Sequence, residues 1–289
     1  MVSKIEREIE AVCAVAERLG LRRISPVVLG GYSNTLIRLA PYPVVARVAK
    51  ATGGIRDLGD LVAREIAFAE ALAQRGAPSV RVSSLLPPGP HSELGFHLSF
   101  WDFIEVEIER PRPAQAGAML RQLHITLDDV TAVNLRPLSP FYTAAEIAAG
   151  PLAERLGAES KKLVRTMFER VQQDLAAIST PFRALHGDAH HGNLWVTRNG
   201  MVWGDLEDAC AGPIEWDLAC LTASSVVLGT RCAATEALVS YDRPYNSSHL
   251  DLLIIARTLQ AIAWALVALE SIDGNPRLLA RLAWIRARA

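Results

Sequence analysis

Residues 186–217 read HGDAHHGNLWVTRNGMVWGDLEDACAGPIEWD, and no other stretch of the chain is more informative. It places Asp188, Asn193 and Asp205 in polar segments around two short apolar runs. Phosphoryl transfer needs a carboxylate that orients and deprotonates a hydroxyl, together with two oxygen donors that hold Mg²⁺. The spacing is typical of that chemistry. The alternative is a polar loop before a hairpin, in which Asp, Asn and Gly are only turn residues.

The histidines and the last carboxylate of this stretch are expected to support the loop. His186 is predicted to hydrogen-bond the loop backbone and hold Asp188 in place, with a role as base the less favoured alternative. Asp217 begins an apolar helix and is predicted to brace the loop. His190 and His191 have no third ligand at a sensible spacing, so loop packing or, for His191, a substrate contact is favoured over zinc.

Two carboxylates directly follow the second predicted metal ligand. Glu207 and Asp208 are candidates for a supporting acid, a metal ligand or a substrate contact. A polycationic acceptor would call for an acidic pocket, and the candidates for it are Glu207, Asp208, Glu215, Asp242 and Asp251. A solvated helix face explains these scattered charges equally well, so they do not identify the acceptor.

Composition excludes several classes of function. The 30 basic residues against 31 acidic give a net charge of -1, which argues against a nucleic-acid surface or an anionic-membrane anchor as a partner. The four cysteines show no CxxC spacing, and the N-terminus is too charged for a secretory signal, so we expect a cytoplasmic protein. The apolar residues 252–269 are interrupted by Arg257 and Gln260, which favours a buried helix over a membrane span.

The first part of the chain, residues 1–104, is predicted to be a small mixed N-lobe. Ser3 and Glu6 form a capping-box pattern before an amphipathic helix that ends at Gly20. A second helix is expected at residues 58–74. The predicted strands are residues 27–29, 36–39, 44–48, 80–86 and 96–104.

The second part, residues 105–289, is predicted to be a mostly helical C-lobe that carries the catalytic loop and the acceptor site. Strands are expected only at residues 194–197 and 201–204, joined by a turn. The helical patterns cover residues 113–127, 143–156, 158–178, 215–228, 248–271 and 275–288.

A glycine-rich turn in the N-lobe is a candidate phosphate loop. Gly30-Gly31-Tyr32-Ser33-Asn34 lies between two predicted strands. Glycines such as Gly31 let backbone amides approach phosphate oxygens, and Ser33 and Asn34 would add side-chain donors. The alternative is an ordinary hairpin turn.

A cation is also needed to bind nucleotide phosphates. Arg47 lies within a predicted strand, where a charge is unusual unless it faces a cleft or an edge, and Lys50 is the competitor just beyond it. Glu65 on the following helix is the candidate carboxylate that orients the cation. The alternative is that Arg64 and Glu65 are ordinary solvated helix charges.

Together these motifs resemble the aminoglycoside phosphotransferase family, the small-molecule kinases with a protein-kinase-like fold. The family's loop reads His-Gly-Asp, four residues, then Asn, and its metal segment reads roughly Asp-x-Glu-x-Ala, a Gly, then Asp-Leu-Ala. The resemblance covers about residues 25–270. The matching residues here are His186-Gly187-Asp188, Asn193, Asp205, Glu207, Ala209, Gly212 and Asp217-Leu218-Ala219.

The resemblance implies a bilobal α+β fold and a role for each matching position. Asp188 is then the catalytic aspartate, and Asn193 and Asp205 are the magnesium ligands. Arg47, paired with Glu65, takes the place of the usual phosphate-binding lysine.

The resemblance further implies that residues 100–104, with Trp101 and Phe103, form a hinge that binds adenine through backbone groups. Arg47 in place of Lys is one departure from the family pattern, and it puts the phosphate geometry in doubt. Pro213 stands where an acidic residue is common, and Leu206 replaces a frequent aromatic residue.

The implied activity is Mg²⁺-dependent transfer of the γ-phosphate of ATP or GTP to a hydroxyl of a small molecule, such as an aminoglycoside or another antibiotic. A kinase of a sugar, a choline-like alcohol or another metabolite is the alternative within the family. A catalytically silent nucleotide-binding regulatory protein is an alternative of another class. A protein kinase is disfavoured, because the segment between Asp205 and Asp217 is too short to dock a peptide. The sequence leaves the acceptor, the nucleotide and the oligomeric state open.

Overall fold

The computed structural model describes residues 3–31, 34–50, 57–128, 130 and 135–289. Their contacts divide into two compact units. Unit 1 takes the described residues up to Ile108 and the segment Val196–Glu207. Unit 2 takes those of Glu109–Trp195 and Asp208–Ala289. The sequence suggests one boundary near residue 104, and it does not anticipate that residues 196–207 join the first unit.

Unit 1 is built on an antiparallel sheet in the order β1-β2-β3-β5-β4. The register of β2 and β3 pairs Leu36 with Arg47, and that of β3 and β5 pairs Arg47 with Ser99. The three strands predicted in the first fifty residues are confirmed. The elements of this unit are α1 (Lys4–Arg18), β1 (Ser25–Gly30), β2 (Asn34–Ala40), β3 (Val44–Ala49), α2 (Leu58–Gln74), β4 (His91–Glu93), β5 (Phe96–Asp102) and β8 (Gly200–Trp203).

The alternation of side chains along β3 explains where the cation lies. Ala46 and Val48 belong to the apolar core that Val12 and Val15 of α1 form with the sheet. Successive strand residues point to opposite faces, so Arg47 faces away from that core. The capping box predicted for α1 is also present, because Ser3 N donates to Glu6 Oε2 at 2.6 Å and Glu6 N donates to Ser3 Oγ at 3.3 Å.

The strand predicted at residues 80–86 is wrong. Only isolated bridges form there, from Ser79 to Trp203 and from Val82 to Trp101. The Oγ atom of Ser83 accepts hydrogen bonds from the backbone N–H groups of the two residues before Pro87, at 3.2 and 3.0 Å. These side-chain hydrogen bonds turn the chain and compete with the backbone hydrogen bonds that a strand would make. The strand that pairs with β5 is instead β4.

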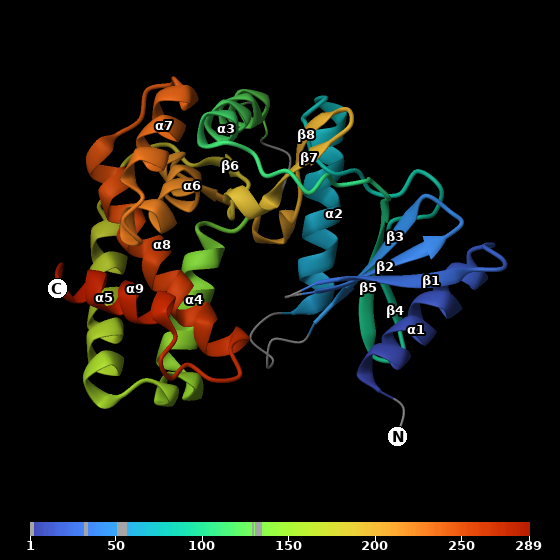
Figure 1. Cartoon of the computed structure of the whole chain (residues 1–289), viewed down its shortest axis with the longest axis horizontal. Coiled ribbons are helices and arrows are strands. Elements are labelled where there is room, and N and C mark those ends of the chain that lie inside the picture. The colour runs from blue at the N-terminus through green and yellow to red at the C-terminus, as the bar shows by residue number, and fades with distance from the viewer. Residues whose placement is uncertain (1–2, 32–33, 51–56, 129, 131–134) are drawn as a thin grey trace. The chain divides into compact units, whose positions relative to one another are not determined.

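Unit 2 is mostly helical, and α8 is its central element, with α4, α5, α6 and α9 packed against it (Figure 1). By length and composition, α8 is the one helix in the described part of the chain that is apolar enough to cross a membrane. More than half of its most apolar window is buried inside unit 2, as expected for a core helix. The elements are α3 (Pro113–Leu127), α4 (Ser139–Ala149), α5 (Ala158–Ala176), β6 (Arg183–Leu185), β7 (Leu194–Thr197, which continues into unit 1), β9 (Cys210–Gly212), α6 (Glu215–Val227), α7 (Arg231–Tyr241), α8 (Ser247–Ala268) and α9 (Pro276–Arg286).

Three features of unit 2 differ from the prediction. The helix expected at residues 143–156 begins earlier, as α4, and breaks at Gly150 before the short 3₁₀ turn Pro151–Arg155, because the residue before a proline disfavours helical geometry. Helix α7 was not predicted, because its buried residues are mainly small alanines. The short strands β6 and β9 were also missed; they pair with each other, and β6 ends at the residue before His186.

The packing of α3 on α7 gives a test of the fold. A Cβ atom on Gly117 of α3 would lie 2.0 Å from the backbone oxygen of Ala237 on α7. We expect Gly117→Ala to force the two helices apart and to lower the free energy of unfolding by about 1–3 kcal/mol. Urea denaturation followed by circular dichroism measures this change.

The matched control is Gly59→Ala in the first turn of α2. There the nearest atom to an added Cβ is the Asp57 Oδ1 at 3.5 Å, an ordinary contact. Replacing a helical glycine without a clash should leave stability unchanged or raise it by up to about 1 kcal/mol. Equal effects of the two substitutions would contradict the packing assigned to α3 and α7.

Candidate active site

Arg47 is the centre of a charged cluster in unit 1. Its Nη1 donates to Oε1 of Glu65 at 2.6 Å. Its Nη2 donates to Oδ1 of Asp205 at 2.6 Å and to Oε2 of Glu207 at 2.8 Å. Asn34 Nδ2 donates to the same Glu207 oxygen at 2.9 Å. The predicted cation, its predicted carboxylate and one predicted metal ligand therefore meet in what we call the Arg47 cluster: Arg47, Glu65, Asp205 and Glu207.

The Arg47 cluster is not neutral. Three carboxylates share one guanidinium, which leaves two negative charges when all of them are ionised. Burial raises the pKa of Glu65 above its usual range; Arg47 opposes this rise, and the charges of Glu207 and Asp205 add to it. The Arg47 side chain is 11% exposed and that of Glu65 is 3% exposed, so loss of Arg47 would leave the buried Glu65 carboxylate without its ion-pair partner, at a cost of about 3–5 kcal/mol. A divalent cation would reduce the imbalance.

Asp205 is held in an unusual backbone conformation. It lies two residues after the end of β8 and has a φ of 57°. This left-handed geometry costs a residue with a side chain about 1 kcal/mol or more, and it persists only where the surroundings impose it. The ion pair with Arg47 is one such constraint. Strain of this kind is concentrated at functional sites.

The glycine-rich turn is described only in part. Gly31 has a φ of 134°, and a Cβ atom there would lie 1.8 Å from the backbone oxygen of Asn34, so only glycine fits. Ser33, predicted to add a phosphate contact, lies outside the described residues, as does Tyr32. Lys50, the competing cation, places its Nζ 3.4 Å from the backbone oxygen of Gly31.

The two predicted hinge residues, Trp101 and Phe103, form hydrogen bonds within unit 1. Trp101 is buried, and its indole nitrogen donates to Ser99 Oγ at 2.8 Å. The backbone N–H of Phe103 donates to the Pro43 oxygen at 2.9 Å, and the guanidinium of Arg38 lies 4.0 Å from the centre of the Phe103 ring. An adenine contact by Phe103 would therefore have to use its carbonyl group or its ring.

Asp188 lies in unit 2, and every oxygen of its carboxylate is engaged. Asn193 Nδ2 donates to Asp188 Oδ2 at 3.0 Å and to the Asp188 backbone oxygen at 2.9 Å. His190 Nε2 lies 3.3 Å from Oδ2. Because His190 Nδ1 accepts a hydrogen bond from Gly192 N, Nε2 carries a proton and donates. Arg257 of α8 pairs with Oδ1.

Arg257 is a partner of Asp188 that sequence reasoning missed. Its side chain is 15% exposed and that of Asp188 is 18% exposed. Burial alone raises the pKa of Asp188, but Arg257 and then His190 outweigh it, so the net pKa lies below its usual range. The available signal was chemical: Arg257 is the only charged residue among residues 252–269, and a charge in an apolar helix needs a partner.

The bracing contacts predicted for His186 and Asp217 are present. The backbone N–H groups of His186 and Gly187 donate to the two carboxylate oxygens of Asp217, each at 2.9 Å. His186 Nδ1 accepts from Asp188 N at 3.3 Å. Gly187 has a φ of 83°, and a Cβ there would lie 1.7 Å from the backbone oxygen of Asp208. The middle residue of the His-Gly-Asp motif therefore has to be glycine.

Two further buried residues complete this support. His124 of α3 places Nε2 3.1 Å from Asp217 Oδ2 and Nδ1 2.8 Å from the hydroxyl of Tyr241 on α7. Burial raises the pKa of the Tyr241 hydroxyl, so it stays protonated and donates. Sequence reasoning missed both residues, because a histidine and a tyrosine on separate helices carry no spacing signal.

The remaining candidate substrate contacts are divided between the units. Glu207 belongs to the Arg47 cluster of unit 1. Asp208, the next residue, belongs to unit 2, where its charge acts on Arg257. His191 is also in unit 2; its Nδ1 atom is buried and has no hydrogen-bond partner among the described residues. Burial lowers the pKa of His191, which keeps its ring neutral.

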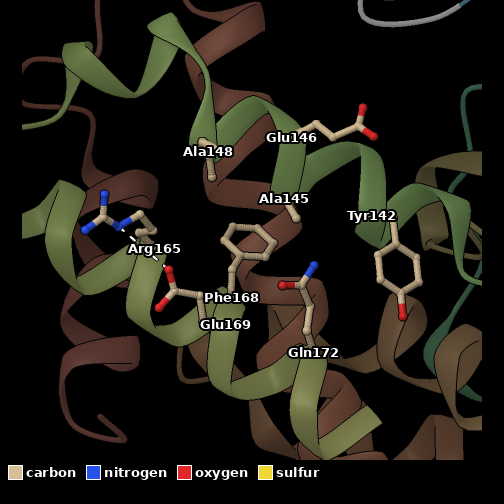
Figure 2. Close-up of a pocket in the computed structure, with 9 residues that line it drawn as sticks. Tyr142, Ala145, Glu146, Ala148, Arg165, Phe168, Glu169 and Gln172 are labelled. Atoms are coloured by element: carbon tan, nitrogen blue, oxygen red, sulfur yellow. Dashed lines mark ion pairs between the residues drawn. The ribbon is translucent and has the colours of Figure 1, made fainter. Parts of the chain in front are cut away.

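Two of the five carboxylates considered for an acidic acceptor pocket have other surroundings in unit 2. Glu215 is 2% exposed and accepts a hydrogen bond from Asn246 N at 2.7 Å. Asp251 lines a surface pocket of about 540 Å³ that also contains Arg170 and Arg288. A second pocket of about 360 Å³, lined by α4 and α5, contains none of the loop residues (Figure 2).

No metal site made only of His, Cys, Asp or Glu side chains exists within the described ranges. The predicted ligands are instead an amide and a carboxylate. Asn193 donates through Nδ2 and Asp205 uses Oδ1, which leaves Asn193 Oδ1 and Asp205 Oδ2 without a contact in the described part of the chain. Hard oxygen donors of this kind suit Mg²⁺.

Comparison with known sequences gives a match to one family. A sequence model of the family described as "Phosphotransferase enzyme family" matches residues 26–244. That range covers most of the chain and includes both the Arg47 cluster and the catalytic loop. A comparison with curated proteins found no match.

Solved structures share the fold at low sequence identity. Amicoumacin kinase hAmiN, in complex with AMP-PNP, Ca²⁺ and Ami, has a TM-score of 0.73 at 12% identity over 100% of this chain and 97% of that one. Choline kinase LicA from Streptococcus pneumoniae has a TM-score of 0.71 at 16% identity, with 99% and 98% covered. The GDP and kanamycin complex of APH(2")-IIia has a TM-score of 0.63 at 14% identity, with 96% and 97% covered.

The support of the catalytic loop by Asp217 can be measured. Asp217→Ala leaves two buried backbone N–H groups and His124 without their acceptor, so we expect a loss of about 3–5 kcal/mol in the free energy of unfolding. Urea denaturation is the measurement. The matched change Asp251→Ala, at an exposed position of α8, should stay within about 0.5 kcal/mol of the parent. A similar stability for both variants would remove Asp217 from its bracing role.

Proposed function

The chain belongs to the phosphotransferase enzyme family, and we propose that it is a Mg²⁺-dependent kinase that phosphorylates a hydroxyl group of a small molecule, with ATP or GTP as donor. One observation carries this proposal. Asn193 Nδ2 donates a hydrogen bond to the Asp188 carboxylate. The loop that carries both residues donates two backbone N–H groups to the carboxylate of Asp217. A positioned carboxylate beside an oxygen-donor amide is the arrangement that phosphoryl transfer requires.

In the proposed reaction, Asp188 is the catalytic residue. It accepts the hydrogen bond of the acceptor hydroxyl and orients its oxygen towards the γ-phosphorus. The new bond joins that oxygen to the γ-phosphorus, while the bond from the γ-phosphorus to the β,γ-bridging oxygen breaks. The hydroxyl proton passes to Asp188, and the nucleoside diphosphate leaves.

Asn193 and Asp205 are the proposed ligands of Mg²⁺, which when bound neutralises charge on the β- and γ-phosphate oxygens. The uncontacted oxygens Asn193 Oδ1 and Asp205 Oδ2 support this assignment, as does the excess negative charge of the Arg47 cluster. His186 and Asp217 are positioning residues, because they contact the loop backbone.

Unit 1 supplies the proposed nucleotide contacts. Arg47, oriented by Glu65, binds the phosphates after exchanging one of its carboxylate partners for a phosphate oxygen. A planar guanidinium suits this exchange, because it keeps several donors in a fixed geometry. The other proposed nucleotide contacts are Gly31, Ser33, Asn34, Trp101 and Phe103.

Replacing the proposed catalytic residue tests the reaction. Asp188→Asn keeps the shape of the side chain and its contact with Asn193 but cannot take the hydroxyl proton. We expect kcat to fall by about 10²–10⁴-fold, while the affinity for Mg²⁺–AMP-PNP changes by less than about threefold. Coupled detection of ADP and calorimetric titration measure the two quantities, with an acceptor found in a screen of hydroxyl compounds.

The control for this experiment is Asp174→Asn, which alters an exposed carboxylate on α5 that pairs with Arg170. Its turnover should match that of the parent. Full turnover in Asp188→Asn would remove the residue from the reaction, whatever the nucleotide affinity shows.

Two variants decide which cation binds the phosphates. Arg47→Lys keeps the charge but loses the planar fork, and we expect it to weaken Mg²⁺–ATP binding by about tenfold. Lys50→Ala should change the affinity by less than about threefold, because this residue lies outside the Arg47 cluster. Nucleotide affinities from calorimetry make the comparison, and the opposite ranking would assign the phosphates to Lys50.

A further inference from the structure

Arg257 lies where the acceptor hydroxyl has to bind. Each carboxylate oxygen accepts about two hydrogen bonds. Oδ2 of Asp188 already accepts from Asn193 and His190, whereas Oδ1 is paired only with Arg257 in the described part of the chain. The open position is therefore on Oδ1. A hydroxyl that binds there comes to lie beside the guanidinium.

Some N–H groups of the Arg257 guanidinium make no hydrogen bond within the described ranges. Arg257 Nη2 pairs with Asp188 and Nη1 with Gln260 Oε1. Within the described ranges these contacts use two of its five N–H groups. The side chain is partly exposed, so the remaining N–H groups form a planar fork of the kind that binds a carboxylate through two parallel hydrogen bonds.

A second donor beside Arg257 has no partner. Gln260 is 1% exposed, and its Nε2 makes no hydrogen bond to any described residue. Nε2 belongs to the same planar amide as the Oε1 that Arg257 contacts, so it lies next to the guanidinium. A buried amide N–H₂ without an acceptor is costly, and an anionic oxygen would satisfy it.

The surroundings of Arg257 add positive charge. Desolvation, and then the charges of Arg257 and of Arg277 on α9, lower the pKa of Arg281 on the same helix. Asp208 is the carboxylate, besides Asp188, whose charge acts on Arg257. An ammonium group bound beside Asp188 would meet a guanidinium that stays protonated.

We propose that the acceptor carries a carboxylate close to the hydroxyl that is phosphorylated, and that Arg257 and Gln260 bind this carboxylate. The substrate class is then a small hydroxy acid, in contrast to a polycationic aminoglycoside or a choline-like alcohol. This inference rests on the proposed function, because it assigns the acceptor of the same site.

The test compares a neutral polyol with analogues in which a hydroxymethyl group is replaced by a carboxylate or a hydroxyl group by an amine. Glycerate, glycerol and 3-amino-1,2-propanediol form one matched set, and glucuronate, glucose and glucosamine form another. Both sets are included in a broad panel of hydroxyl compounds, and kcat/KM is measured from ADP release with Mg²⁺–ATP. We expect the compounds with the highest kcat/KM to be carboxylates, by about tenfold or more over their neutral counterparts.

The variant Arg257→Gln tests whether Arg257 binds the acceptor or acts elsewhere in the reaction. For a carboxylate acceptor, we expect KM to rise by about 30-fold or more, with the KM for ATP unchanged and a neutral acceptor affected by less than about threefold. Arg257→Lys restores the charge and should recover part of the loss. Thermal melting and Mg²⁺–AMP-PNP affinity confirm that each variant is folded. Arg165→Gln, which removes an exposed helix ion pair, is the matched control and should change neither the KM for the acceptor nor the KM for ATP.

Three results would overturn the inference. A cationic compound with the highest kcat/KM would reject the carboxylate acceptor but leave the proposed kinase function intact. A uniform fall in kcat for every acceptor in Arg257→Gln, with KM unchanged, would assign Arg257 to the transferred phosphoryl group instead. Transfer to no member of the panel, with nucleotide binding intact, would contradict the proposed function itself.

Discussion

Unit 2 depends above all on the hydrogen bonds that the carboxylate of Asp217 accepts. This carboxylate is fully buried, yet it accepts hydrogen bonds from the backbone of His186 and Gly187 and from the ring of His124. Through these contacts one side chain at the start of α6 joins the catalytic loop to α3, and through Tyr241 to α7. A buried charge is tolerated only when its lone pairs are satisfied in this way. The backbone that leads into Asp188 is therefore held by the carboxylate of Asp217.

Sequence reasoning succeeded where the signal was local. The spacing of His186, Asp188 and Asn193, the capping box at Ser3 and the strand at residues 44–48 each involve residues close in the chain, and hydrogen bonds or register fix their geometry. The pairing of Arg47 with Glu65 was also foreseen, because a lone charge inside a strand needs a partner. The roles of these residues in the reaction remain proposals.

The failures have physical causes as well. Residues 80–86 have the pattern of a strand, but the hydroxyl of Ser83 bonds nearby backbone N–H groups and turns the chain. Helix α7 packs through small residues against Gly117, so its buried face gives little hydrophobic signal. Arg257 was noted only as an interruption of an apolar run. Its partner lies 69 residues away in the chain, and only the folded structure reveals such a long-range ion pair.

The connectivity of the two units constrains how such a protein can recombine with its relatives. The chain passes from one unit to the other after Ile108, after Trp195 and after Glu207, so unit 1 is not a continuous segment. A chimera that exchanges only residues 1–108 would take Arg47 and Glu65 from one parent but Asp205 and Glu207 from the other. To exchange the whole of unit 1, the hairpin segment Val196–Glu207 has to be exchanged together with residues 1–108. Taking every residue of the Arg47 cluster from one parent therefore needs two crossovers more than an exchange of residues 1–108 alone.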